Sequence, residues 1–305
     1  MNAIEITGLC KQFKGKKMTR VDALKNLDLQ IEAGEVFGFL GPNGAGKSTT
    51  IKLVMGLLTP TSGKASVMGI DSTLTDSRRK VGFLPENPAF YDYLSAEEYV
   101  TFVGSQFRMD AALLKRRSEE VLKRLDLWEA RKRPMRGYSK GMVQRVGLAQ
   151  ALVHDPEVYI LDEPMSGLDP IGRSLVKDII LDLKKRGKSV FFSTHITDDV
   201  EKVCDRVGVI VQGSLLALDT VENIVRSGIE GYIVQTKRDQ GNHESLKEFK
   251  ELRRNDFFVE YMVPVVRFNE FTALVGQNSV EITLIETKRK DLEAFFLEIV
   301  EKGGA

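Results

Sequence analysis

The chain has 305 residues, 42% hydrophobic and 29% charged, which is typical of a folded globular protein with a buried core. Its 44 basic and 43 acidic residues leave a formal net charge of +1, so no overall electrostatic attraction to nucleic acid or anionic lipid is expected. The N-terminus lacks the apolar core of a signal peptide, and no stretch reaches the ~20 apolar residues of a membrane-spanning helix. We therefore expect a cytoplasmic protein whose two cysteines, Cys10 and Cys204, are buried and reduced.

The first 60 residues predict strands followed by a helix. Apolar and polar residues alternate over residues 1–32, as in antiparallel strands with one wet face. The run Val36–Leu40 is apolar throughout, which indicates a strand buried on both faces. A glycine-rich turn follows, and an apolar helix is expected over Thr49–Leu58, ended by Pro60 and Gly63.

The glycine-rich turn is the first motif with a chemical meaning. Gly41–Ser48 fits G-x-x-x-x-G-K-[ST] without a gap, and its place between a buried strand and a helix favours a phosphate-binding loop over a chance match. Such a loop points successive backbone N–H groups, and the positive end of a helix, at phosphate oxygens. Lys47 should contact the β- and γ-phosphates, and the Ser48 hydroxyl should bind Mg²⁺. The predicted nucleotide-binding residues here are Gly41, Asn43, Gly44, Ala45, Gly46, Lys47, Ser48 and Thr49.

Residues from about 90 to 153 predict a helical insertion. Ser95 and Glu98 have the spacing of a capping box. Apolar residues at helical spacing follow in two groups, which predicts two amphipathic helices. The first group is Tyr99, Phe102, Val103 and Phe107, and the second is Val121, Leu122 and Leu125.

Buried strands return at Val158–Leu161, Val190–Phe192 and Val207–Val211. The first of them ends in two adjacent acids. Asp162 at a strand end would hold Mg²⁺, and Glu163 would face an attacking water as general base. Taken alone, the two acids fit an ordinary exposed strand terminus equally well.

The composition changes after about residue 220. Residues 237–256 are polar and charged and contain no motif. Val280, Ile282 and Leu284 then alternate as in a strand, and a helical stripe follows. The stripe consists of Leu292, Phe295, Phe296, Ile299 and Val300. We predict a small α+β accessory domain over residues 221–305, most simply a packing or regulatory cap.

Three further motifs complete an ordered set. Tyr138–Arg145 precede a helical face, Ser166–Asp169 follow Glu163, and His195 ends a buried strand. With these motifs in order, residues 1–220 resemble the ATPase subunit of an ABC (ATP-binding cassette) transporter, of the type paired with small export-type permeases. The resemblance implies an α/β fold: a P-loop NTPase (RecA-like) core with an antiparallel β subdomain and the helical insertion over about 90–153.

The resemblance also implies roles for single residues. Phe13 occupies the place of the aromatic that stacks on adenine. Ser139 and Gly141 match the signature motif, which faces the γ-phosphate bound to the other subunit. Asp169 matches the D-loop aspartate that communicates across the dimer, and His195 matches the switch histidine that contacts the γ-phosphate and helps hold the water.

The chain departs from the family pattern at two places. The usual signature L-S-G-G-Q reads Tyr-Ser-Lys-Gly-Met over Tyr138–Met142, so affinity and communication can differ. Glu86 stands where the family commonly has glutamine; a carboxylate keeps an oxygen for Mg²⁺ or water but loses the amide donor. We expect Glu86 to act in catalysis and metal binding, coupling ATP state to the transporter with altered metal preference or rate.

The implied protein hydrolyses ATP with Mg²⁺ in a dimer with a second nucleotide-binding subunit, identical or homologous. It powers translocation, with export expected, by a separate membrane-spanning permease, and it is itself peripheral on the cytoplasmic face of the cell membrane. Residues 86–94 would receive a cytoplasmic helix of the permease, although Phe90, Tyr91 and Tyr93 fit the insertion's own core equally well.

Three other functions compete with this interpretation. The main alternative is a soluble ABC-type ATPase acting on nucleic acid or ribosomes, which a single cassette and near-neutral charge disfavour, so no nucleic-acid partner is expected. Glu163 and His195 disfavour a non-catalytic nucleotide-gated module. A GTPase is the least favoured, because no Asn-Lys-x-Asp guanine reader follows the phosphate loop.

Overall fold

The structure is a computed structural model that describes residues 1–14, 20–227, 229–289 and 292–303. The chain forms two compact units: the first comprises Met1–Val221 together with the residues from Ile299 onward, and the second comprises Glu222–Glu298. No helix among the described residues is both long and apolar enough to cross a membrane.

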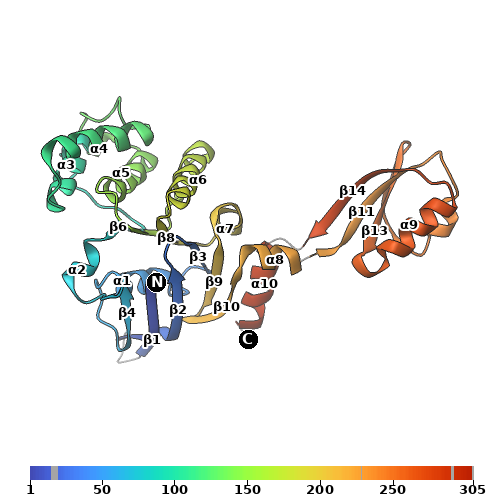
Figure 1. Cartoon of the computed structure of the whole chain (residues 1–305), viewed down its shortest axis with the longest axis horizontal. Coiled ribbons are helices and arrows are strands. Elements are labelled where there is room, and N and C mark those ends of the chain that lie inside the picture. Colours follow the sequence, from blue (N-terminus) through green and yellow to red (C-terminus); the bar gives the residue numbers. More distant parts are fainter. Residues whose placement is uncertain (15–19, 228, 290–291, 304–305) are drawn as a thin grey trace. The chain divides into compact units, whose positions relative to one another are not determined.

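A six-stranded sheet lies at the centre of the first unit, in the order β10-β9-β3-β8-β7-β6 (Figure 1). Neighbouring strands from β9 to β6 run parallel, and β10 pairs antiparallel with β9. All residues of β3, β7 and β8 are buried, as their continuous apolar runs predict. The strands are β3 (Val36–Leu40), β6 (Val81–Leu84), β7 (Val158–Asp162), β8 (Ser189–Thr194), β9 (Arg206–Val211) and β10 (Ser214–Thr220).

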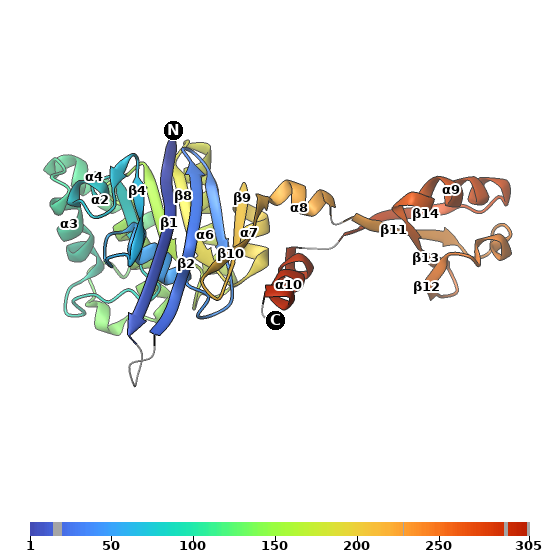
Figure 2. The same cartoon turned by 90° about the horizontal axis from the view of Figure 1, so that it is seen from below.

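An antiparallel sheet, in the order β2-β1-β4-β5, packs on this central sheet. Figure 2 shows β1 and β2 as long neighbouring strands, with β4 beside β1. Ile4 and Ile6 of β1 share one hydrophobic core with Phe37 and Phe191 of the central sheet, so the predicted alternation over residues 1–32 is confirmed. The strands are β1 (Asn2–Lys14), β2 (Arg20–Glu32), β4 (Ser62–Val67) and β5 (Ile70–Asp71).

Three helices between β6 and β7 gather at the end of the first unit opposite β1 and β2 (green in Figure 1). These are α3 (Ala96–Gln106), α4 (Ala111–Arg124) and α5 (Lys140–Leu152). Ser95 caps α3 in the predicted box with Glu98. The other helices up to residue 227 are α1 (Lys47–Val54), α2 (Thr75–Arg78), α6 (Pro170–Lys185), α7 (Thr197–Val203) and α8 (Val221–Ser227).

The predicted bounds of the helix after the glycine-rich turn were wrong at both ends. The helix α1 begins at Lys47 and ends at Val54, before Pro60 is reached. Gly56 has φ +63° and donates to Leu53 O, while Leu57 N–H donates to Lys52 O, which is a Schellman motif. Glycine adopts this left-handed conformation without steric cost, so Gly56 stops the helix.

The buried face of α3 also differs from the predicted stripe. Phe102 is 50% exposed, whereas Val100 and Gly104 are buried. A Cβ at Gly104 would lie 2.2 Å from Leu114 Cδ1 of α4, so α4 approaches α3 at the glycine. Packing between the two helices, rather than the largest apolar side chains, therefore decides which face is buried.

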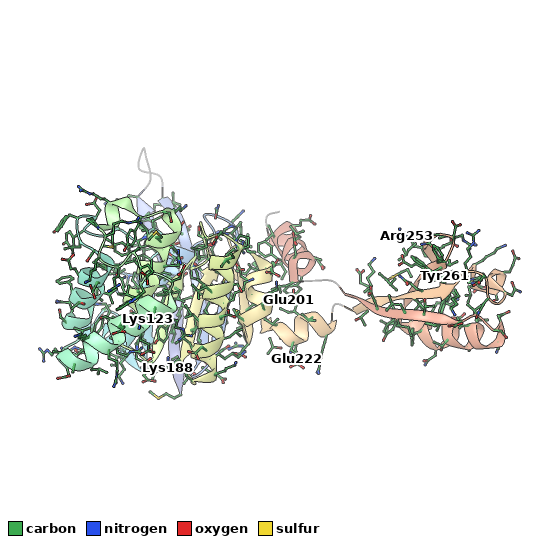
Figure 3. All side chains as sticks on the ribbon, turned by 90° about the horizontal axis from the view of Figure 1, so that it is seen from above. Lys123, Lys188, Glu201, Glu222, Arg253 and Tyr261 are labelled. Carbon is green, nitrogen blue, oxygen red and sulfur yellow. The ribbon has the colours of Figure 1, made fainter. Side chains whose placement is uncertain are left out.

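The second unit has a hydrophobic core of its own, around Tyr261 and Phe271. Tyr261, labelled in Figure 3, shares a hydrogen bond of 3.0 Å with His243 Nδ1. The predicted strand near residue 282 is present, but Leu284 is 40% exposed. The sheet order is β12-β13-β11-β14, formed by β11 (Ile229–Lys237), β12 (Lys250–Arg254), β13 (Phe258–Pro264) and β14 (Ile282–Arg289), with helix α9 (Phe268–Gln277). The predicted helical stripe lies on α10 (Leu292–Gly303).

A buried carboxylate joins α6 to α7. Asp199 on α7 is 1% exposed and accepts hydrogen bonds of 2.9 Å on both oxygens from Arg173 Nη2 of α6. Lys177 Nζ, one turn further along α6, lies 3.0 Å from the same carboxylate. Because α6 directly follows Asp169 and α7 closely follows His195, this cluster fixes the two loops relative to each other.

Replacing Asp199 with Asn should lower the free energy of unfolding by about 2–4 kcal/mol, because the mutation removes the charge that two partly buried cations share. The neighbouring Asp198 is more than half exposed and pairs with Lys177 and Lys202, so Asp198→Asn is the matched control. That control should cost less than about 1 kcal/mol. Urea denaturation measures both variants, and equal losses would contradict the assignment.

His154, which follows α5, is held as a neutral ring. Its ring stacks on Phe107 with 3.6 Å between centroids, and its Nε2 lies 3.1 Å from Val81 O, which requires the proton on Nε2. No described residue hydrogen-bonds its Nδ1. Burial is the main cause that lowers the pKa of His154 to about 4 from the ordinary value of 6.5.

The lowered pKa of His154 gives stability a definite pH dependence. Between pH 6.5 and pH 4 the unfolded chain binds a proton at this residue that the folded chain does not, so stability falls as pH is lowered through this range. The loss between pH 7 and pH 5 should be about 2 kcal/mol. His154→Gln keeps an N–H donor but does not titrate, so urea unfolding should show a flatter profile; parallel profiles would contradict this.

Candidate nucleotide-binding and hydrolysis site

The glycine-rich turn joins the end of β3 to the start of α1. Gly46 caps α1 with φ +111°, and a Cβ at this position would lie 2.7 Å from Ala23 O. Both the conformation and the close approach of β2 therefore require glycine. The turn leaves the first N–H groups of α1 at the mouth of a pocket, where they can bind an anion.

The pocket has a volume of about 260 Å³. Its lining includes the predicted loop residues from Asn43 to Thr49 together with Glu86 and Glu163, and it also includes Ala23 of β2. Phe13 is not among the lining residues: it lies on β1 opposite Val21, is 39% exposed, and has Lys11 Nζ 5.2 Å from its ring centroid. The structure thus gathers the loop and two acids, while adenine stacking by Phe13 stays a prediction.

Lys47 brings a buried positive charge to the pocket. Its Nζ donates to Gly41 O at 2.7 Å and to Pro42 O at 3.3 Å, and it lies 3.3 Å from Glu163 Oε1. The side chain is only 6% exposed. The loop's own carbonyls and one carboxylate therefore hold the ammonium group where a phosphate would meet it.

One hydroxyl positions both strand-end acids. Ser193 Oγ of β8 donates to Asp162 Oδ1 at 2.6 Å and accepts from the backbone N–H of Glu163 at 3.0 Å. Glu163 has φ +49°, an unusual conformation for a residue other than glycine, which turns the chain as β7 ends. The two carboxylates have different partners: Asp162 contacts Ser193, whereas Glu163 contacts Lys47 and His195.

The oxygen ligands expected for Mg²⁺ lie next to one another. Ser48 Oγ is 3.4 Å from Glu86 Oε2, and its hydroxyl also interacts with Asp162. Burial raises the pKa of Asp162, hydrogen bonds from Ser193 and Ser48 oppose this, and the charges of Glu86 and Glu163 add to it. A divalent cation would relieve this concentration of negative charge.

The oxygen donors beside the phosphate loop are compatible with Mg²⁺. No group of three or more His, Cys, Asp and Glu residues able to hold a metal alone occurs in the part of the chain that the structure describes. Mg²⁺ keeps several waters and is commonly bound through one or two carboxylates plus substrate phosphates. Ser48 and Asp162, with Glu86 nearby, provide such a partial oxygen shell.

His195 follows β8 and completes the cluster. Its Nδ1 lies 3.0 Å from Glu163 Oε2 and 3.2 Å from Oε1, and the histidine side chain is 46% exposed. The carboxylate of Glu163 is thus held between Lys47 and His195. A base oriented by two partners in a pocket beside a phosphate loop suits activation of a water.

Ser139, Gly141 and Asp169 are not among the residues that line the pocket. Ser139 caps α5 and accepts from Met142 N–H at 3.2 Å, so the predicted helix start is confirmed. Asp169 caps α6 and accepts from Gly172 N–H at 2.9 Å. The N-terminus of each of these helices carries partial positive charge that can interact with an anion.

Three residues of the site were missed from the sequence. Ala23 enters through the pairing of β2, and Gln144 of α5 donates to Glu163 O at 3.2 Å. Ser193 pairs in parallel register with Asp162. A serine inside a buried apolar strand was the available signal for Ser193, whereas nothing in the sequence marks Ala23.

Ser193→Ala should lower kcat about 10- to 100-fold, because both Glu163 and Asp162 lose the hydroxyl that positions them. The Mg²⁺ concentration needed for half-maximal activity should also rise. Steady-state ATPase assays across a Mg²⁺ titration measure both effects. Ser189→Ala, at the other end of β8, is the control, and an unchanged kcat in Ser193→Ala would refute the role.

Comparison with known proteins identifies related chains. The ABC transporter family model matches residues 24–166. An uncharacterized ABC transporter ATP-binding protein of Nostoc is 39% identical over 93% of this chain and 84% of the relative. A second such protein, from Synechocystis, is 43% identical over 75% of this chain, and the match spans 65% of that relative, slightly less than two thirds of its length.

A similar solved structure is a dimeric ATP-binding cassette, MJ0796, in a post-hydrolysis state bound to ADP and Pi. It is 27% identical to this chain, with a TM-score of 0.66, and the match covers 72% of this chain and 98% of the cassette. The similarity therefore extends over almost the whole cassette.

Proposed function

Because this chain belongs to the ATP-binding proteins of the ABC transporter family, we propose that it drives transport through a separate membrane-spanning permease. The chain is an ATPase that uses ATP and Mg²⁺. The observation that carries the proposal is that Glu163, which lines the pocket beside the phosphate loop, contacts both Lys47 and His195.

The proposed chemistry is phosphoryl transfer to water. The loop N–H groups and Lys47 bind and orient the phosphates, while Ser48 and Asp162, with Glu86 nearby, hold Mg²⁺. Bound Mg²⁺ supplies positive charge that stabilises the charge developing on phosphate oxygens. Glu163 accepts the proton of the attacking water, and His195 fixes the direction of that carboxylate through Nδ1.

We propose that two chains complete each other's sites. Ser139 and Gly141 lie outside the pocket of their own chain, at the exposed start of α5. A symmetric pair would bring this helix end to the phosphates bound by the mate, and Asp169 would lie at the same interface. The dimeric cassette of similar fold supports this arrangement.

Residues 86–94 are the proposed contact with the permease, on the cytoplasmic face of the membrane. Phe90 packs on Tyr99 with 4.6 Å between ring centroids, so this aromatic belongs to the helical insertion. Tyr91 and Tyr93 are 59% and 66% exposed, and their rings lie 5.9 Å apart, centroid to centroid, at a tilt of 46°. Exposed aromatics beside Glu86 suit a partner helix whose position depends on the state of the pocket.

Two further assignments complete the proposal. We assign residues 1–220 to the ATPase domain and residues 221–305 to an accessory domain; the separate core around Tyr261 supports the latter for Glu222–Glu298, whereas the residues from Ile299 onward belong to the first compact unit. We also propose export as the direction of transport. The resemblance of Glu86 and the Tyr138–Met142 signature to export-type subunits supports this direction.

Glu163→Gln should lower kcat for ATP hydrolysis about 100- to 10,000-fold, because the general base is lost. The phosphate loop stays intact, so MgATP should still bind and should now accumulate the dimer. Phosphate release assays and light scattering measure the two effects. Glu157→Gln, an exposed acid just before β7, is the control and should keep wild-type turnover.

A Glu163→Gln protein that binds MgATP yet stays monomeric in the presence of its permease would overturn the dimer proposal. Co-purification from detergent-solubilised membranes then tests transport, since the ATP-bound variant should carry a multi-spanning protein. Salt-sensitive binding to RNA or DNA without such a partner would instead indicate the soluble ATPase alternative.

A further inference from the structure

Gln144 is a buried amide that connects two functional regions. It lies on α5, five residues after Ser139, and is 5% exposed. Its Nε2 donates at 3.2 Å to Glu163 O and at 3.2 Å to Pro164 O. The helix that begins at the signature serine is therefore hydrogen-bonded to the backbone of the general base.

The backbone of Glu163 needs such external support. Its φ of +49° is a conformation that costs free energy for a residue with a Cβ, and it persists only where neighbours enforce it. Ser193 Oγ holds its N–H, while Gln144 and the N–H of Ser166 hold its carbonyl. Pro164, which follows, contributes a second carbonyl to Gln144.

The helix α5 can transmit a displacement of its Ser139 end to Gln144, because it is a continuous helix with a buried face. It runs from Lys140 to Leu152 and is capped by Ser139. Val146, Ala149 and Leu152 on its inner face are buried. A shift of the capped end therefore moves Gln144 with it, since only about one and a half turns of helix separate them.

We propose that Gln144 is a positioning residue that couples the signature end of α5 to the general base of the same chain. This inference rests on the proposed dimer, in which Ser139 meets the nucleotide bound by the mate. Contact between Ser139 and that nucleotide sets the position of α5. Because Gln144 is hydrogen-bonded to the Glu163 backbone, the position of α5 in turn sets the position of Glu163. Each base is then fully competent only when the opposite site holds nucleotide, so the two hydrolysis events are coupled.

The proposed coupling can be tested with mixed dimers in which only one chain keeps the general base Glu163. The active chain keeps Glu163, and its mate carries Glu163→Gln, with or without Lys47→Ala to weaken nucleotide binding at the mate's loop. With an otherwise wild-type active chain, the turnover rate per assembled dimer should fall at least 10-fold when the mate carries Lys47→Ala. With Gln144→Met in the active chain, the rate should be low in both cases and differ less than 2-fold.

Gln150→Met is the matched control, because Gln150 lies on the same helix and donates to Phe83 O at 3.1 Å, away from the Glu163 backbone. With Gln150→Met in the active chain, the turnover rate should still fall at least 10-fold when the mate carries Lys47→Ala. Gln144→Glu, which keeps the size of the side chain, is the second variant should Gln144→Met fold poorly. Placing Gln144→Met in the mate instead should leave the rate of the active chain within 2-fold.

The outcomes separate this inference from the proposed function. Light scattering reports whether each mixed dimer assembles with MgATP, and a complete absence of dimers overturns both. Dimers in which Gln144→Met keeps the 10-fold dependence overturn the coupling alone. Two further outcomes would overturn the coupling alone. One is an otherwise wild-type active chain whose turnover rate does not depend on Lys47→Ala in the mate; the other is a loss of turnover rate when Gln144→Met is placed in the mate.

Discussion

A buried carboxylate between two nitrogen groups organises the active region of this protein. Glu163 is only 8% exposed; its Oε1 lies 3.3 Å from Lys47 Nζ and its Oε2 lies 3.0 Å from His195 Nδ1. A buried charge is tolerated only where partners compensate it, so the three side chains must be delivered together. The parallel register of β3, β7 and β8 does this, because each strand ends at the same edge of the sheet and each precedes one of the three groups.

In the proposed dimer, the residues of each site come from two surfaces. The pocket gathers the groups that bind phosphate and activate water, while the starts of α5 and α6 lie elsewhere on the same unit. In such a pair, each chain would hydrolyse its own ATP and complete the site of the other chain. Buried polar contacts connect the two surfaces within one chain: Gln144 reaches Glu163, and Asp199 joins α7 to Arg173 of α6.

Much of this could be read from local sequence. The phosphate loop, the acids after β7 and the serine that caps α5 are each fixed by a few neighbouring residues, since turns, helix starts and strand ends depend on short-range geometry. Continuous apolar runs marked β3, β7 and β8 because parallel strands are buried on both faces. The alternation in β1 and β2 marked a sheet with one core-facing side.

The tertiary structure decided what depends on residues far apart in the chain. The hydroxyl of Ser193 could be assigned to Asp162 and Glu163 only once β7 and β8 were in register, and Ala23 lines the pocket only because β2 passes Gly46. Phe102 is likewise exposed because α4 approaches α3 at Gly104. The spacing of apolar residues along α3 does not reveal which face of the helix meets α4. The sequence by itself determined the local chemistry and the strand-end acids, whereas long-range pairing decided which groups share a pocket, since side-chain contacts depend on packing rather than on spacing along the chain.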